Sequence, residues 1–529
     1  MNNSKYENIV ESIDLDYIIR NFDLSIVMPY YKKLNDFKNA LPHNAPLFQR
    51  NGIEIVISMD DDSEEIELLQ FIKDFPFINW VVAINRSKHE WRNPSKAINV
   101  GIKNATKKYV MVCSPESIFY TDAILQMRYK LEFYKNHYAI GTVAFTNNLN
   151  CNISDDMFTK PYGSIMVERK HLIDISGYAE ELDKWGFDDD NIRARLELNK
   201  IKKLLMLEVK LIHVDYSIQD TKKRINTESE TLKYSYASKM LIPDSITINN
   251  SNWGCDFNEI VYDWKNNKYS YELVTKYLNN FESYKIVNEK TFTQKYNRIL
   301  LVQSYNEECI INEFLIHMAN YFDGFILLDD GSNDATFEIA DHKKLLLKVK
   351  KTRTTFNDLE NRNICLDLAS FLMSEWFCFM DTDERFDKRY SDFSKHIDTQ
   401  KNIISFGIVH LWDKENIYNA EYPETNLGIS HKLRMFRNIG HCQITTNKMK
   451  LHFLLVPYFD DIEHVDILFL HYGMLTKEDR LLKHSLYTKE DRDKDQYSYM
   501  HLLRDNAKTL LVKDIEWHNG TFINIKTTN

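Results

Sequence analysis

Acidic side chains gather at four places in this chain, and each place directly follows a short apolar run. A carboxylate at the end of a strand can bind a divalent cation or accept a proton from an attacking hydroxyl. A single Asp in this setting is often only a turn former or a helix cap. The repeated order and spacing favour a functional interpretation of Asp60, Asp61, Glu116, Asp329, Asp330, Asp381 and Asp383.

Asp381 and Asp383 are one residue apart, which lets both carboxylates reach one hard divalent cation and leaves positions for phosphate oxygens and water. His471 could add an imidazole ligand suited to Mn²⁺, or it could be a histidine satisfied within the core. We predict Mn²⁺ or Mg²⁺ at these residues, where the ion would neutralise a departing diphosphate. In the first half of the chain, Glu116 and His213 could hold a weaker metal.

The segments before these residues have the pattern of buried parallel strands. Short apolar runs alternate with longer amphipathic segments, which predicts an α/β fold with ligands beyond the carboxyl ends of the strands. The spacing from Asp60 to Ser114 nearly equals that from Asp329 to Asp381, which indicates an internal duplication. The expected strands are 24–28, 53–58, 109–113 and 209–213 in the first copy, and 298–302, 324–328, 376–380 and 467–471 in the second.

These runs divide the chain into four predicted parts. The first domain spans 1–216 and the second spans 297–475. Between them, 217–296 is polar and aromatic with a helical pattern, so we expect a helical connector that packs on both domains. The charged segment 476–529 is expected to be a helical tail.

The composition excludes several classes of protein. The 529 residues include only 14 Gly and 10 Pro, and no glycine pattern fits a G-x-G-x-x-G loop or a P-loop. A net charge of −10 argues against nucleic acid as a partner, and the 7 scattered cysteines indicate reduced thiols. The N-terminus is too polar for a signal peptide, and no apolar stretch is long enough to cross a bilayer. We therefore expect a cytoplasmic protein, with at most peripheral association at the inner face of the plasma membrane.

The second half resembles the family 2 glycosyltransferases, which have the Rossmann-like GT-A fold, use nucleotide-sugar donors and invert the anomeric centre. The resemblance lies in Ser304-Tyr305-Asn306-Glu307-Glu308, 328–336, Glu360-Asn361-Arg362-Asn363, Met380-Asp381-Thr382-Asp383-Glu384, 432–437 and 470–473. It implies that Asp329 and Asp330 hold the nucleoside and that Asp381 and Asp383 hold the metal and diphosphate. The donor-binding residues that it implies in this half are Tyr305, Glu307, Asp329, Asp330, Arg362 and Thr382.

The first half also looks like this family and implies a second GT-A domain in tandem. Its motifs are 28–31, 60–63 and 95–102, and the implied donor-binding residues are Pro29, Tyr30, Asp60, Asp61 and Glu116. Residues 185–196 are similar to the acceptor-side motif of chondroitin-polymerase and galactosyltransferase relatives, in which an Asp is the catalytic base. By resemblance this role falls to Asp189, with Asp188 beside it, and Trp185 and Phe187 could stack on a sugar. The alternative is a solvated first turn of a helix.

The two halves depart from the family pattern at different points. Ser114-Pro115-Glu116 stands in the first half where Asp-x-Asp is expected, and Asp62 is interpreted as the counterpart of Gly331. The second half has no clear equivalent of Asp189. Its candidate bases are Asp413, Asp460, Asp461 and Glu463, and the sequence does not choose among them.

The resemblance implies a bifunctional inverting glycosyltransferase that builds a surface polysaccharide of the capsule or O-antigen type. Its partners would be nucleoside-diphosphate sugars, with UDP-sugars favoured, and an oligosaccharide or lipid-linked acceptor. The alternative is one active C-terminal glycosyltransferase with a degenerate N-terminal domain that binds the acceptor. A sugar nucleotidyltransferase would need a glycine-rich loop after the first strand, and the sequence has none there.

Overall fold

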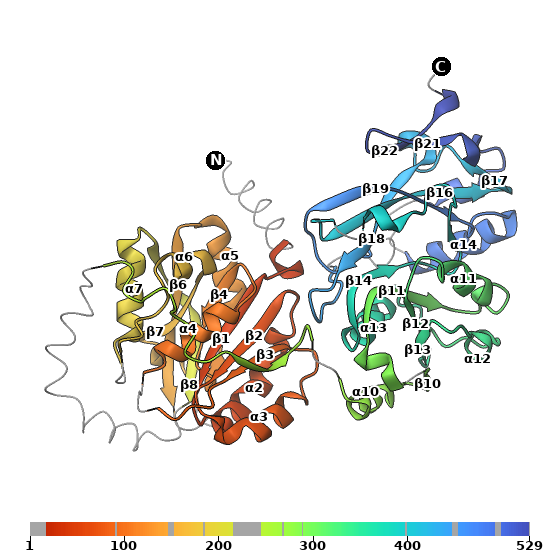
Figure 1. Cartoon of the computed structure of the whole chain (residues 1–529). Helices are drawn as coiled ribbons and strands as arrows, with labels where there is room; N and C mark the ends of the chain where they lie inside the picture. The colour runs from red at the N-terminus through yellow and green to blue at the C-terminus, as the bar shows by residue number, and fades with distance from the viewer. Residues whose placement is uncertain are drawn as a thin grey trace, which may run out of the picture. The chain divides into compact units, whose positions relative to one another are not determined.

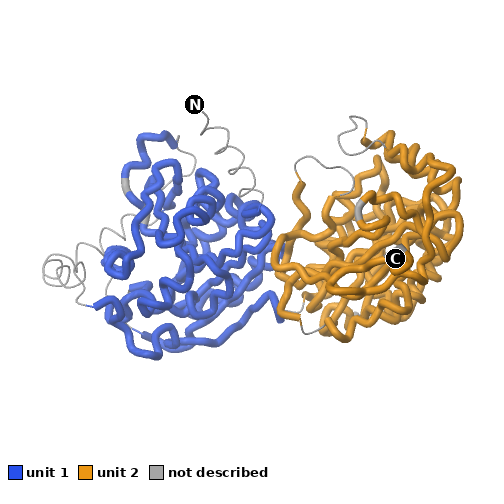
Figure 2. The backbone as a smooth tube through the Cα atoms, turned by 90° about the horizontal axis from the view of Figure 1, so that it is seen from above, with its two compact units in different colours: residues 1–267 blue, residues 268–529 orange. Residues whose placement is uncertain are grey.

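A computed structural model describes residues 17–89, 93–146, 153–182, 186–214, 245–266, 269–287, 289–396, 399–446, 453–491 and 499–527. The chain forms two compact units, residues 1–267 (unit 1) and 268–529 (unit 2), and each is described by itself (Figure 2). Much of the predicted connector, residues 217–244, lies outside the described residues.

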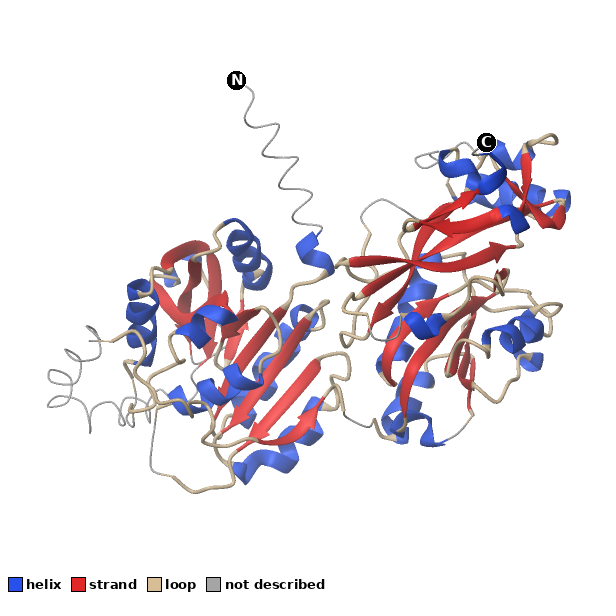
Figure 3. Ribbon diagram, turned by 45° about the horizontal axis from the view of Figure 1, so that its top comes forward, coloured by secondary structure: helices blue, strands red, loops and turns tan. Residues whose placement is uncertain are grey.

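Unit 1 contains a nine-stranded sheet in the order β5-β8-β6-β7-β4-β1-β2-β3-β9 (Figures 1 and 3). Its central strands β4, β1, β2 and β3 are parallel. β2 and β3 are buried along their whole length, as expected for strands covered on both faces. The strands are β1 (Leu24–Tyr30), β2 (Ile53–Met59), β3 (Asn79–Ile84), β4 (Tyr109–Val112), β5 (Ser117–Phe119), β6 (His137–Thr146), β7 (Lys160–Glu168), β8 (Lys202–Val214) and β9 (Glu259–Asp263).

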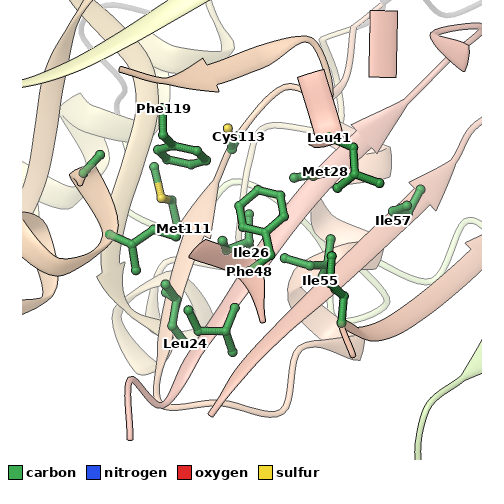
Figure 4. Close-up of a cluster of buried hydrophobic side chains, with 14 of the residues drawn as sticks. Leu24, Ile26, Met28, Leu41, Phe48, Ile55, Ile57, Met111, Cys113 and Phe119 are labelled. Atoms are coloured by element: carbon green, nitrogen blue, oxygen red, sulfur yellow. The ribbon is translucent and has the colours of Figure 1, made fainter. Parts of the chain in front are cut away.

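Helices cover both faces of this sheet. Successive side chains of a strand point to opposite faces, so alternate residues of each strand pack against different helices. Ile26 and Met28 of β1 belong to one buried cluster with Phe48 of α2 (Figure 4). Val27, between them, belongs to a second cluster with Ile98 of α4. The helices of unit 1 are α2 (Leu34–Phe48), α3 (Glu65–Ile72), α4 (Ser95–Asn104), α5 (Ala123–Phe133), α6 (Arg169–Asp174) and α7 (Asp188–Leu198).

The sheet of unit 2 repeats this strand order. Its strands run β15-β19-β16-β18-β14-β11-β12-β13-β10, and β17 and β20 extend it beyond β16. The parallel core is β14, β11, β12 and β13. The sheet strands are β10 (Ser283–Ile286), β11 (Lys295–Ser304), β12 (Gly324–Asp329), β13 (Leu345–Lys350), β14 (Met373–Phe379), β15 (Glu384–Phe386), β16 (Ile403–Trp412), β17 (Lys414–Asn419), β18 (Ser430–Arg437), β19 (Ile462–His471) and β20 (Thr509–Leu511), and β21 (Ile515–His518) pairs with β22 (Thr521–Asn524).

The helices of unit 2 pack on this sheet and on its C-terminal extension. They are α10 (Tyr271–Leu278), α11 (Ile311–Met318), α12 (Thr336–Ile339), α13 (Asp358–Ser370) and α14 (Lys477–Glu490). α14 begins with a capping box, in which the Thr476 hydroxyl and the Asp479 carboxylate each accept a backbone N–H of the other residue.

Strand register aligns the two units residue by residue. The N–H of Asp60 donates to the carbonyl of Tyr30 at the end of β1, and the N–H of Asp330 donates to that of Ser304 at the end of β11. Val27 pairs with Val112, and Leu301, which is equally far from its strand end, pairs with Phe379. Counting onward from these pairs, Ser114 corresponds to Asp381 and Glu116 corresponds to Asp383. The same count makes Asp61, and not Asp62, the counterpart of Gly331, which corrects the interpretation from sequence.

The predicted α/β fold with two large sheets is confirmed, and the structure adds strands where we expected helix. The segment 245–296 contains α10, but β9 and β10 also lie in it and pair antiparallel with β3 and β13 at the sheet edges. The tail contains α14 and then the short strands β20, β21 and β22. β9 and β10 are largely exposed, so their sequences lack the apolar pattern that identifies a buried strand.

The predicted boundaries at 216, 296 and 475 stay predictions, because compact units need not end where an expected connector or tail begins. Among the described residues, no helix is both long and apolar enough to cross a membrane.

Candidate active sites

The carboxyl edge of the unit 2 sheet brings together Asp383, His471 and Lys483. Glu384 of β15 pairs with His471 of β19, so Asp383 lies next to the imidazole. Asp383 Oδ2 is 3.3 Å from His471 Nε2 and 2.9 Å from Lys483 Nζ. Lys483 Nζ is also 3.1 Å from His471 Nε2. The ammonium group of Lys483 on α14 therefore contacts both the carboxylate and the imidazole, which also contact each other.

Gly473 lies against this cluster, and its lack of a side chain provides the space that Asp383 and Lys483 fill. A Cβ at Gly473 would lie 2.0 Å from Asp383 Oδ2 and 2.2 Å from Lys483 Nζ. Burial alone would raise the pKa of Asp383, but the charges of Lys483 and His471 hold that pKa well below its usual range. Burial opposes the charge on Lys483, yet Asp383 raises the pKa of the ammonium above its ordinary value. Both groups are therefore ionised at neutral pH.

His471 has partners at both ring nitrogens. Its Nε2 is 3.1 Å from Lys483 Nζ and 3.3 Å from Asp383 Oδ2, and its Nδ1 is 2.9 Å from Nδ1 of His410. Burial and the charge of Lys483 lower the pKa of His471, and the charge of Asp383 opposes this shift.

Asp381 is paired with arginine and does not join the Asp383 cluster. Arg362 of α13 donates to Asp381 Oδ1 and to Asp358, 3.2 Å away, and Arg434 lies 3.9 Å from Asp381 Oδ2. Burial alone would raise the pKa of Asp381, but Arg362 and Arg434 lower it. The predicted site residues Asp381 and Arg362 are therefore direct partners.

These side chains do not form a divalent cation site as the structure arranges them. Two carboxylates and an imidazole are suitable ligands for Mn²⁺. However, Asp381 faces Arg362, and the ammonium of Lys483 already contacts both Asp383 and His471. Within the described ranges, no three His, Cys, Asp or Glu side chains are placed to hold one metal ion. The requirement for Mn²⁺ or Mg²⁺ stays a prediction.

A second cluster in unit 2 surrounds Asp329 and Asp330 after β12. Asp329 accepts the N–H of Ser332 at 2.7 Å, and Asp330 pairs with Arg353 at 2.7 Å. The Arg353 guanidinium lies 3.6 Å from the centre of the Tyr305 ring, which remains partly exposed. Gly331 has φ +72°, and a Cβ there would lie 2.9 Å from the carbonyl oxygen of Lys351, so this tight turn suits glycine. The Arg353 guanidinium therefore links Asp330 to the Tyr305 ring at the carboxyl edge of the sheet.

Glu307 connects these clusters. Burial and the nearby charge of Asp383 raise the pKa of Glu307 to about 7, and a hydrogen bond with the Thr382 hydroxyl opposes the rise. Glu307 and Thr382, both predicted donor-binding residues, therefore lie beside Asp383.

Unit 1 has a related cluster at the corresponding edge. Ser117 of β5 pairs with His213 of β8, which places Glu116 beside the imidazole. Glu116 Oε1 is 3.5 Å from His213 Nε2 and 3.0 Å from Lys33 Nζ. Glu116 is buried, whereas Lys33 and His213 are partly exposed. A lysine again lies against the acidic residue next to a histidine.

The other residues of unit 1 that we predicted to bind the donor differ in their partners and in their exposure. Asp60 is 3.0 Å from His89 Nε2, and Asp61 caps a turn through the N–H of Ser63. Pro29 lies within β1, where it pairs with Ser58. Tyr30 is only 1% exposed, and its hydroxyl donates to Glu64, so its side chain faces the core and its role in donor binding stays a prediction. An aromatic residue at a strand end can face the core or a ligand, and the sequence pattern is the same for both.

Asp188 and Asp189 begin helix α7, and Gly163 of β7 leaves room for the second of them. A Cβ at Gly163 would lie 2.2 Å from Asp189 Oδ2. Met111 of β4 pairs with Met166 of β7, so Gly163 lies beyond the carboxyl end of β4, on the side of Glu116. Asp189 therefore reaches the same edge of the sheet.

Burial raises the pKa of both carboxyl groups. Desolvation by the surrounding protein and the charge of Asp189 raise the pKa of Asp188 to about 7. Burial also raises the pKa of Asp189, and the charge of Arg193 opposes the rise. A carboxylate with a raised pKa suits a general base. Trp185 lies outside the described residues, and Phe187 precedes the helix with φ +68°.

The candidate bases of unit 2 lie elsewhere. Asp460, Asp461 and Glu463 lie at the start of β19, which runs to His471, so about 25 Å of strand separates them from the Asp383 cluster. Asp461 pairs with Lys401 at 3.1 Å. Asp413 pairs with Arg480 at 2.8 Å. None of these described contacts supports a role as base.

The sequence gives little indication of the roles of Lys483, Lys33 and Gly473. Lys483 is 100 residues away from Asp383 along the chain, so no local motif connects them. Lys33 was part of the turn after the first strand, but its side chain alone carried no signal. Gly473 lies two residues after His471 in a chain with only 14 glycines. Its position was the one sequence feature that could have pointed to a crowded site there.

Comparison with known proteins identifies the family of one segment. Residues 300–453 match the family model Glycosyl transferase family 2, and a comparison with curated proteins gave no match. Among solved structures, S. aureus TarS is 14% identical with a TM-score of 0.29, over 39% of this chain and 40% of that chain, less than two thirds of its length.

Two further solved structures are similar at the same level. Mannosyltransferase PcManGT from Pyrobaculum calidifontis, in complex with GDP-Man and Mn²⁺, is 11% identical with a TM-score of 0.27, over 41% of this chain and 67% of that chain. The catalytic domain of Drosophila β1,4-galactosyltransferase 7 with xylobiose is 12% identical with a TM-score of 0.27, over 41% and 78%. The family model thus covers one segment of the chain: residues 300–453, within unit 2, match glycosyltransferase family 2.

Proposed function

We propose that the chain is a bifunctional inverting glycosyltransferase, in which each unit transfers one sugar from a nucleoside-diphosphate donor. The observation that carries the proposal is the repetition of one strand order with an acidic residue and a histidine in register at the same edge. One of the two copies contains the family 2 match. Because ligands of open α/β sheets bind beyond the carboxyl ends of the strands, both copies have a donor site there.

The residues of unit 2 suit a nucleoside-diphosphate sugar, with a UDP-sugar as the favoured donor. The turn at Asp329 and Asp330, with the Tyr305–Arg353 stack beside it, would hold the nucleoside. The Asp383 cluster lies where the diphosphate and the sugar would follow. His471 lies in this cluster as a positioning group.

In unit 1, Asp189 would act as the base and Asp188 would tune it. The acceptor hydroxyl attacks the anomeric carbon as the bond from that carbon to the diphosphate oxygen breaks. The electron pair of that bond leaves with the diphosphate, and the hydroxyl proton goes to the carboxylate. A single displacement of this kind inverts the anomeric centre. The raised pKa of the carboxyl pair matches this task.

The proposed acceptor is a growing surface polysaccharide of the capsule or O-antigen type, presented as an oligosaccharide or on a lipid. Two sites in one chain suit a repeating disaccharide, because the product of one site is the acceptor of the other. Attachment at the inner face of the plasma membrane would be peripheral, with both sites in the cytoplasm.

The direct test supplies labelled UDP-sugars and acceptor to the wild-type chain and to the Asp189→Asn and Asp383→Asn variants. Each variant should lose transfer of one sugar and keep transfer of the other. Full transfer of every sugar by both variants would contradict the proposal.

A second candidate function is supported by the departures in unit 1. Ser114 occupies the position that Asp381 occupies in unit 2, so unit 1 lacks the ion pair between Asp381 and Arg362. Unit 1 would then bind the acceptor and unit 2 alone would transfer sugar. Calorimetric titration of the full chain with UDP distinguishes the two candidate functions. Two bound equivalents of UDP favour two donor sites. One bound equivalent that the Asp330→Asn variant loses favours the second candidate.

A further inference from the structure

Both units hold a lysine ammonium at the same point relative to the sheet. In unit 2, Lys483 Nζ lies 2.9 Å from Asp383 and 3.1 Å from His471. In unit 1, Lys33 Nζ lies 3.0 Å from Glu116, which also contacts His213. Register makes Glu116 the counterpart of Asp383, so the two lysines face equivalent carboxylates.

The two lysines come from unrelated parts of the fold. Lys33 precedes α2, three residues after the end of β1, and the equivalent residue three positions after β11 is Glu307. Unit 2 therefore has an acidic residue where unit 1 has its lysine, and it receives its positive charge from Lys483 on α14 instead. Two different segments thus place a lysine ammonium against the equivalent carboxylate. This repetition indicates that the site requires a positive charge there, and it argues against a chance surface ion pair.

An ammonium in this place is suited to a diphosphate. Lysine is a compact point charge that binds phosphate oxygens through three donors. Asp383 and His471 fix Lys483, and the missing side chain of Gly473 gives the pair its space. The Lys483 side chain as a whole is 22% exposed.

We propose that Lys483 in unit 2 and Lys33 in unit 1 are donor-binding residues whose ammonium groups take the place of a divalent cation. Each unit then binds a nucleoside diphosphate without added metal. The inference rests on the proposed function, because it identifies the cation of that same site. It also extends the site of unit 2 beyond residues 300–453, since α14 lies outside the family match.

The first test measures UDP binding by calorimetry with the full chain in EDTA and, separately, in MnCl₂. The wild type should bind two UDP equally well in both buffers. Lys483→Met should weaken one site and Lys33→Met the other by about 10-fold or more, as expected for loss of a charge-assisted hydrogen bond. The matched control is Lys477→Met on the same helix, because Lys477 pairs with the exposed Asp505 and should leave both sites unchanged.

The second test measures metal binding directly, and its decisive measurement is made on the wild-type chain. The wild-type chain is titrated with Mn²⁺ alone, and free Mn²⁺ is followed by electron paramagnetic resonance. The expected result is no tight Mn²⁺ site in the wild type and a gain of one site in Lys483→Ala, which the further change Asp383→Asn removes. Tight Mn²⁺ binding by the wild type overturns the inference.

The outcomes separate the inference from the function on which it rests. UDP binding that requires Mn²⁺, or that Lys483→Met leaves unchanged, overturns the role of the lysine and leaves the proposed transferase intact. An absence of UDP binding in both buffers overturns the proposed function together with the inference.

Discussion

Unit 1 and unit 2 place an acidic residue and a histidine at the same positions of the same strand order, but different segments complete their sites. Unit 1 takes its ammonium from the turn after its first strand, at Lys33. Unit 2 takes it from a helix after its last sheet strand, at Lys483. The sheet thus dictates where charges must meet, and the loops and tails that supply them can change.

The comparison extends to an ion pair that only unit 2 has. Asn99 and Asn363 each hold a backbone N–H and a backbone carbonyl through the same side-chain atoms, so the helices α4 and α13 align at these residues. One position earlier, Arg362 corresponds to Ile98. Unit 1 therefore lacks a counterpart of Asp381 and a counterpart of Arg362. The loss of both residues together avoids a buried charge without a partner, which would be destabilising.

The largest expected effect tests whether unit 1 has kept catalysis. Asp189→Asn should lower the rate of transfer by this unit by about 10²–10⁴-fold, the usual contribution of a general base. In the wild type, kcat/KM for this sugar should rise with pH as Asp189 ionises, at a pH above the ordinary range of a carboxyl group because burial raises its pKa. Transfer of the second sugar serves as the internal control. An unchanged rate for both sugars would assign unit 1 to acceptor binding.

The next effect tests whether the two routes to the ammonium are interchangeable. Lys483→Met should weaken UDP binding by unit 2 by about 10-fold or more. Adding Glu307→Lys moves the lysine to the position that it has in unit 1, so the double variant should recover most of the lost affinity. Glu307→Met with Lys483→Met is the matched control and should not recover it. Equal affinity of the two double variants would show that the position of the charge does not matter.

Some of these features could be predicted from the sequence because they are local. Apolar runs followed at once by carboxylates located the parallel strands and the edge where Asp383 and Glu116 lie. The late histidines were found because each ends an apolar run, and the structure pairs each with the strand that follows its carboxylate. Repeated spacing was enough to anticipate two copies of one sheet order.

Other features depend on contacts that no local pattern encodes. Lys483 joins Asp383 across a long stretch of chain, and only the fold of the tail brings them together. Tyr30 resembled a ligand contact but faces the core, because the strand's alternation decides its direction. The Gly331 turn was aligned one residue out of place, since sequence spacing alone does not set strand register.

A smaller effect tests the two glycines that make room for the acidic groups. Gly473→Ala places a Cβ against Asp383 and Lys483, and it should weaken UDP binding by unit 2 by about 10-fold without changing unit 1. Gly163→Ala places a Cβ against Asp189 and should lower transfer by unit 1 without changing UDP binding by unit 2. Each variant is the control for the other. A loss in both units from either change would indicate general destabilisation, which the melting temperature of the variants reports.

The smallest expected effect concerns stability and its dependence on pH. The pKa of Asp188 is about 7 in the folded chain and has its ordinary value of 3.8 in the unfolded chain, so the folded state binds this proton more tightly. Stability from this group is present below the unfolded pKa and is lost as pH rises through the folded one. Asp188→Asn removes that loss, because its side chain is uncharged at every pH. We expect the variant to melt a few degrees above the wild type at about pH 8, with the advantage shrinking towards about pH 5.

Thermal unfolding followed by circular dichroism across this range checks the difference. Asp190→Asn, at an exposed position of the same first turn, is the comparison variant; because the charge of Asp190 also raises the pKa of Asp188, it should give a smaller gain of the same sign. A pH-independent gain from Asp188→Asn would mean that helix capping, and not the buried charge, is responsible. A gain that grows with pH would show that unit 1 retains a destabilising carboxyl pair at its site, as a working active site does and a degenerate binding domain has no reason to do.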